Sequence, residues 1–144
     1  RLEDDRYVLM AMGIKRFRIL SHHRRKPYLS GLVEAYHDVT TPGYELDMCF
    51  RYAQELFSTY LKLLLQAAKE EDQDIASCLP EAPEDLSYFI AYFLEIQDEQ
   101  KQRFLELTST TQRLREEIGI LRREVPFMRH MLAKPPDNDH SKLN

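Results

Sequence analysis

The segment LDMCFRYAQELFSTYLKLLLQAAK, residues 46–69, decides the fold that this sequence predicts. Its apolar residues return every three or four positions, which is the period of an α-helix with one wide apolar face. A helix of this length needs other elements to cover that face, so we expect it to organise the core. The apolar positions are Cys49, Tyr52, Ala53, Leu56, Phe57, Tyr60, Leu61, Leu63, Leu64 and Ala67.

Three further helices are predicted downstream, at residues 84–94, 99–106 and 111–132. Pro83 and the two acids that follow it suit a first helical turn, because proline loses no needed hydrogen bond there and acids favour the positive helix end. Four helices in sequence favour a bundle, and its last member is long.

The last predicted helix carries a heptad pattern, which favours packing on a second helix. That second helix is either residues 46–69 of the same chain or a helix of a neighbouring chain. Ser109 and Gln112 have the spacing of a capping box at its start. Gly119 suggests a close helix contact, and Pro126 predicts a kink or break near residues 122–125. The heptad positions are Thr111, Leu114, Ile118, Leu121, Val125, Met128 and Leu132.

The first third of the chain reads as strands at residues 6–12, 17–21 and 28–36, with a polar turn at residues 22–26. In the last of these, Leu29, Gly31, Val33 and Ala35 form the more core-facing set, and we expect further structure to cover it. The sequence thus predicts an α+β fold, a partial β-meander followed by four helices. The expected regions are 1–43 for the C-terminal part of a β-subdomain, 44–133 for a helical subdomain and 134–144 for a flexible tail.

The composition suits a folded protein of about one domain. The chain has 144 residues, of which 43% are hydrophobic and 31% charged, and no stretch is long and apolar enough for a transmembrane helix. Two cysteines, Cys49 and Cys78, predict no disulfide scaffold, so we expect a reduced, cytoplasmic protein. Residues 1–44 carry eight lysines and arginines against five acids, while the other hundred carry twelve against nineteen. This asymmetry suggests two subdomains with different surfaces.

No catalytic or cofactor motif is present in the sequence. Phosphate-binding loops, the nucleophile elbow GxSxG and the zinc motif HExxH are all missing, and the acidic pairs are too local to span a cleft. We therefore expect no enzyme activity, no cofactor and no metal. For His22-His23 we favour exposed loop histidines over a metal site, and for Cys49 and Cys78 buried structural thiols.

A basic stretch between Lys15 and Lys26 contains no acid and has Phe17 and Tyr28 nearby. One interpretation is an RNA- or anion-binding surface. The other is a solvated strand face and hairpin tip, which we favour because the isoelectric point is 5.7 and no RNA-recognition signature is present. Nucleic acid is accordingly not the expected partner.

Taken in order, these segments resemble the N-terminal substrate-recognition domain of Lon-type ATP-dependent proteases. The resemblance covers residues 1–132. It rests on the opening acidic turn and strand with its G-x-x-R-x-x-I spacing, and on several motifs of the helical half. The matching residues are Gly13, Arg16, Ile19, Lys26-Pro27-Tyr28, Val33-Glu34, Leu86, Phe89-Ile90-Ala91, Leu94, Gln102, Leu105-Glu106, Arg113-Leu114 and Leu121.

The resemblance implies a PUA-like pseudo-barrel joined to a helical bundle, which engages unfolded or damaged polypeptides and presents them to an AAA+ protease ring. The family's opening strands with their Phe-Pro signatures are missing before Arg1, and no ATPase motif or Ser-Lys centre follows. We therefore expect either an excised piece or a stand-alone member without the motor.

Such a role needs adaptable apolar surface, which methionine and tyrosine side chains provide. The expected partners are unfolded polypeptides, with a homo-oligomer through the last helix as a further possibility and no membrane. The alternative functions are RNA or anion binding and helix-mediated assembly. The candidate partner-binding residues are Arg24, Arg25, Lys26, Tyr28, Tyr36, Met128 and Met131.

Overall fold

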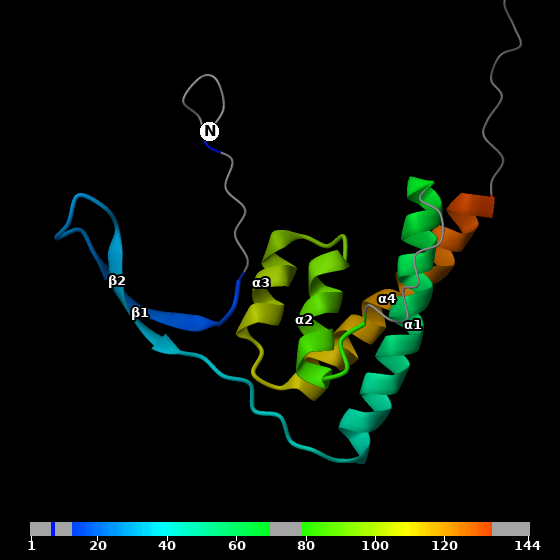
Figure 1. Ribbon diagram of the computed structural model, residues 1–144, viewed down its shortest axis with the longest axis horizontal. Coiled ribbons are helices and arrows are strands. Elements are labelled where there is room, and N and C mark those ends of the chain that lie inside the picture. The colour runs from blue at the N-terminus through cyan, green and yellow to red at the C-terminus, as the bar shows by residue number, and fades with distance from the viewer. Residues whose placement is uncertain (1–6, 8–12, 70–78, 134–144) are drawn as a thin grey trace, which may run out of the picture. The chain divides into compact units, whose positions relative to one another are not determined.

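The computed structural model describes residues 7, 13–69 and 79–133, which form two strands and four helices (Figure 1). The chain divides into two compact units, residues 1–37 and residues 38–144. The predicted α+β class is confirmed, as a hairpin followed by helices. The elements are β1 (Phe17–His23), β2 (Ser30–Ala35), α1 (Tyr44–Ala68), α2 (Pro83–Phe93), α3 (Asp98–Glu106) and α4 (Thr110–Ala133).

The two long helices, α1 and α4, pack on each other and supply most of the core of the helical unit (Figure 1). Arg115 of α4 forms an ion pair with Glu45 of α1, and seven residues later on each helix the Arg122 guanidinium lies 5.8 Å from the ring centroid of Tyr52. This constant offset means that the helices run parallel. The heptad pattern is therefore used within the chain, and its buried members are Leu114, Ile118, Leu121 and Val125.

The short helices α2 and α3 complete this core, adding Leu86, Ile90 and Phe104 as buried side chains. Proline and two acids form the first turn of α2, as predicted. At the start of α4 the Ser109 hydroxyl accepts the backbone N–H of Gln112 at 3.2 Å, which is one half of the predicted capping box. None of the described helices is long and apolar enough to cross a membrane.

The α4 helix continues through Pro126, so of the predicted kink or break near residues 122–125 the break is wrong. Proline has no N–H for the carbonyl of Arg122, but both residues are exposed, and water can hydrate that carbonyl. Val125, next to the proline, is buried in the core and holds the helix in place. The predicted close contact at Gly119 is also wrong, because a Cβ there would meet nothing within 4 Å.

In the first unit, β1 and β2 pair antiparallel with a bulge at Leu20, the residue between Ile19 and Ser21 that has no partner. The predicted turn at 22–26 starts too early, since β1 extends through His23. Gly31 is needed opposite His22, because a Cβ at this position would lie 2.7 Å from the carbonyl oxygen of Ser21. The strand expected at residues 6–12, apart from Tyr7, and the tail at 134–144 lie outside the described residues.

Residues 38–43, here called the linker, precede α1 and belong to the helical unit. The linker is anchored by the side chain of Asp38, which is fully buried and forms an ion pair with the equally buried Arg113 of α4. The boundary between the compact units thus falls just before a buried charge.

Candidate functional site

The hairpin has two chemically different faces. The apolar face is formed by Phe17, Ile19, His22, Leu29, Gly31 and Val33, which line a shallow groove of about 220 Å³ together with Ser30. Within the described part of the chain no residue covers this face, and Phe17, Ile19, Leu29 and Val33 are 59%, 61%, 68% and 49% exposed. The expected core-facing set is therefore exposed here, although its members Leu29, Gly31 and Val33 do share one face with Phe17 and Ile19.

The opposite face, here called the charged face, is built around Tyr36. The guanidinium carbons of Arg16 and Arg18 lie 4.9 and 4.4 Å from the centroid of its ring, within the range of cation–π attraction. Arg18 also donates to Glu34 on the neighbouring strand at 3.4 Å. Both partners of that pair are about half exposed, so it adds little to stability. This face is suited to contacts with acidic or aromatic groups.

The hairpin tip joins the two strands and carries most of the remaining positive charge. Arg24, Arg25 and Lys26 are exposed there, and the Lys26 ammonium lies 5.4 Å from the ring centroid of Tyr28. His22 lines the apolar groove, and the next residue along the strand, His23, points to the opposite side, so the two histidines do not converge on one metal position. Across the described residues, no cluster of three histidines, cysteines or acids could hold a metal ion.

At the far end of α4, apolar side chains continue beyond the covered core. Phe127 and Met131 are 60% and 54% exposed, while Met128 is half-buried against the core. Met128 continues the heptad pattern that faces α1. Phe127 and Met131 lie on a different face of α4, which is buried earlier in the helix, at Arg113 and Ile120. This end of α4 therefore presents adaptable apolar surface.

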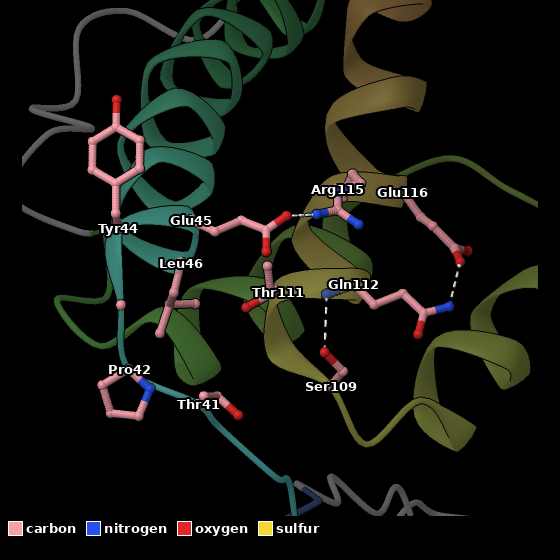
Figure 2. Close-up of a pocket in the computed structure, with 11 residues that line it drawn as sticks. Thr41, Pro42, Tyr44, Glu45, Leu46, Ser109, Thr111, Gln112, Arg115 and Glu116 are labelled. Carbon is pink, nitrogen blue, oxygen red and sulfur yellow. Dashed lines mark hydrogen bonds and ion pairs between the residues drawn. The ribbon is translucent and has the colours of Figure 1, made fainter.

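A larger hollow, of about 680 Å³, lies where the first turns of α1 and α4 meet (Figure 2). Arg115 points across it to Glu45, and Gln112 donates to Glu116 at 3.3 Å. Because the one arginine is paired with a carboxylate, the hollow offers neither a free anion-binding charge nor a converging set of catalytic groups. We assign it no chemistry.

Comparison with known proteins identifies the chain. A family model described as the ATP-dependent protease La (LON) substrate-binding domain matches residues 1–123 of the 144. The chain belongs to the Lon substrate-binding domain family. No curated protein matches it. The resemblance drawn from the sequence is thus confirmed, and the match extends over both the hairpin and most of the helical unit.

In this Lon substrate-binding domain, the predicted partner-binding residues fall in three places. Arg24, Arg25, Lys26 and Tyr28 come together at the hairpin tip, Tyr36 lies on the charged face, and the two methionines lie at the end of α4. Tyr36 is held beneath two arginines, so its ring is less available than that of Tyr28, which is 61% exposed. The role of all these residues in binding stays a prediction.

The most elaborate polar site of this Lon domain was not predicted. Arg113 matched a family motif, but nothing in the sequence indicated that it is buried. The same holds for Asp38, which lies 75 positions earlier in the chain. Glu117, one helical turn after Arg113, is also fully buried. Arginine and glutamate four residues apart normally form an exposed pair on a helix, so their spacing in the sequence does not indicate burial. Cys49, expected to be a buried thiol, is half-buried and free, and its burial raises the pKa of the thiol.

Proposed function

We propose that this chain binds segments of unfolded or damaged proteins and presents them for ATP-dependent proteolysis. The family supplies the class of role, because its members are substrate-binding domains. The hairpin supplies the surface that supports the proposal. Its role is recognition, and the chemistry of peptide cleavage belongs to an AAA+ protease ring that the chain serves.

The observation that carries the proposal is the exposure of the apolar face. Four large apolar side chains, Phe17, Ile19, Leu29 and Val33, stand on one side of a two-stranded ribbon around a groove. An unfolded chain differs from a folded one chiefly in its exposed apolar side chains and unpaired backbone groups. A ribbon of this kind can take up both, by apolar contact on its face and by strand addition at its edge.

The proposal is tested by comparing two substitutions of equal exposure. Ile19 on the apolar face and Leu32 on the charged face are 61% and 58% exposed, so Ile19→Ser and Leu32→Ser remove similar apolar area from opposite sides. Binding to a permanently unfolded model protein is measured by fluorescence anisotropy, with the folded form as control. We expect Ile19→Ser to weaken binding about tenfold, since burying such a side chain contributes about 1.5–3 kcal/mol, and Leu32→Ser to change it little.

Equal affinity for the folded and unfolded forms would contradict the proposal, and so would equal effects of the two substitutions. In the wider setting we propose a PUA-like pseudo-barrel of which the hairpin is a part, and a cytoplasmic location. A homo-oligomer through α4 would have to use its exposed end, because the heptad face is occupied by α1.

The second candidate function is RNA or anion binding by the hairpin. Residues 13–37 carry six lysines and arginines against the single acid Glu34, and part of this charge gathers at the tip. Reversing the charge of Arg24, Arg25 and Lys26 should then abolish RNA binding, and the affinity of the unaltered chain should fall steeply with salt. A salt-independent affinity would exclude this candidate.

A further inference from the structure

The guanidinium of Arg113 forms the centre of a buried polar cluster that reaches four parts of the helical unit. Its Nε donates to Ser87 of α2 at 2.8 Å, and one terminal nitrogen donates to the carbonyl of Leu107 at 2.9 Å. The other terminal nitrogen forms the ion pair with Asp38 of the linker. Tyr88 covers the group, with its ring centroid 4.0 Å from the guanidinium carbon, and its hydroxyl donates to Asp38 at 3.0 Å.

The contacts described for the linker beyond this cluster are hydrogen bonds to the start of α4, where the Thr110 hydroxyl also donates to Asp38 at 3.3 Å. The backbone N–H of Val39 donates to the carbonyl of Thr108 at 2.8 Å, and the hydroxyl of Thr40 lies 3.1 Å from that of Thr110. Residues 39–43 are all exposed, so little apolar surface fixes them. Segments with few buried contacts open at low free energy, and the cost of releasing this one lies mainly in the Asp38–Arg113 pair.

Glu117 lies one helical turn after Arg113, on the same side of α4. Its side chain is fully buried, and among the residues that the structure describes neither of its carboxyl oxygens has a hydrogen-bond partner. Burial raises the pKa of this carboxyl well above its usual value, the nearby positive charge of Arg113 lowers it, and Glu116 raises it again. A buried carboxyl without any partner is costly, so its presence beside a buried arginine calls for an explanation.

We propose that Glu117 is a reserve counterion for Arg113, which lets the linker detach from the helical unit without leaving the guanidinium unpaired. With the linker in place, Asp38 neutralises Arg113 and Glu117 stays protonated. When the linker leaves, Glu117 gives up its proton to water and its carboxylate pairs with Arg113 along the helix. The connection between the hairpin unit and the helices is thus a reversible latch with two paired states.

The groups around the latch are consistent with this exchange. On α4 the charges that act on Glu117 are those of Arg113 and Glu116. From α2 the groups at Arg113 are the hydroxyls of Ser87 and Tyr88, and from the linker Asp38. From α1, Tyr60 interacts with Glu95 and Glu124 further along. The only cation that acts on Glu117 among these described groups is Arg113.

A double-mutant cycle in the full 144-residue chain tests the proposal. Asp38→Asn is made alone and together with Glu117→Gln, and the unfolding equilibrium is measured in urea. Where Glu117 is present, it can replace the lost carboxylate, so Asp38→Asn should raise the equilibrium constant of unfolding only moderately. In the Glu117→Gln background no replacement exists, and the same substitution should raise that constant about ten times more. Equal effects of Asp38→Asn in the two backgrounds would overturn the proposal.

A second measurement uses single variants, which keep the Asp38–Arg113 pair, and so does not depend on the folding of the double variant. Hydrogen exchange of the Val39 amide reports linker opening, and that of the Phe57 amide reports opening of the core. In Glu117→Gln, which has no reserve carboxylate, Val39 should be protected about tenfold more relative to Phe57. Glu124→Gln, the same change seven residues along α4, is the matched control and should leave this ratio unaltered. An unchanged ratio in Glu117→Gln, or equal changes in both variants, would refute the latch.

Discussion

At the scale of single residues, the helical unit is defined by a charge that no solvent reaches. Arg113 is buried together with Asp38, and removing one partner of such a pair costs about 3–5 kcal/mol where no other group compensates the remaining charge. Replacing both by apolar groups is often harmless, so the pair specifies where the linker docks more than it adds to stability. The sequence could not predict this site, because partners 75 positions apart leave no local pattern.

Glu117 makes the stability of the helical unit depend on pH in an unusual direction. The pKa of its carboxyl is raised well above 4.5 in the folded protein, so the folded state holds a proton that the unfolded state has lost. The protonated carboxyl contributes fully to the free energy of unfolding at pH values below its pKa in the unfolded chain. This contribution disappears as the pH rises through its pKa in the folded protein. We expect Glu117→Gln to abolish this loss, as measured by urea unfolding between pH 4 and 8.

Glu124→Gln serves as the control for that titration, since this residue lies on the same helix and is only half-buried. It should retain the fall in stability with rising pH. If Glu117→Gln showed the same fall as the unaltered chain, the carboxyl would be ionised in the folded state, and the assignment of its protonation would be wrong.

At the scale of elements, the period of the apolar residues predicted the helices well, whereas the hairpin could be predicted only in outline. The prediction of residues 46–69 differs from α1 by two residues at the start and one at the end, and α2 and α3 agree as closely. Periodicity succeeds there because burial decides the pattern. The hairpin was harder to predict, because the bulge at Leu20 breaks the alternation of β1 and the predicted strand stops two residues short of its end at His23.

The uninterrupted course of α4 through Pro126 gives a prediction about that helix. Proline within a helix removes one hydrogen bond and costs about 3 kcal/mol relative to alanine. Pro126 is exposed, so alanine can replace it without disturbing the core. We expect Pro126→Ala to raise the free energy of unfolding by about 1–3 kcal/mol, measured by chemical denaturation. No gain, or a loss, would show that the proline ring itself makes a stabilising contact.

At the scale of the whole molecule, all the described side chains of the buried core come from the helices and the residue after α2. The core residues run from Leu46 to Val125, and every described residue of β1 and all but Ser30 of β2 are exposed. The helical unit therefore contains within residues 38–133 everything that its described core needs. The predicted site residues on the hairpin could not be ranked from sequence, since exposure depends on what covers a strand.

This distribution predicts how a shortened chain behaves. A fragment of residues 38–133 should unfold cooperatively, with a midpoint within a few degrees of that of the full chain, as followed by circular dichroism at 222 nm. The Asp38–Arg113 pair must be kept, so a fragment that begins at residue 44 should be less stable. A non-cooperative transition of the longer fragment would mean that the first 37 residues contribute to the helical core.

The bulge on β1 has a consequence for what the hairpin can display. The strand contains one residue more than its partner can match, and at present Leu20 is the one left out. If the surplus moved to the tip, Leu20 would take the place opposite Leu32, and the side chains from Ser21 to His23 would each turn over. His22 would then leave the apolar groove, and Ser21 and His23 would enter its side. A register shift of one position would thus replace the imidazole of His22 on the groove side with that of His23, and it would add the hydroxyl of Ser21 to that side.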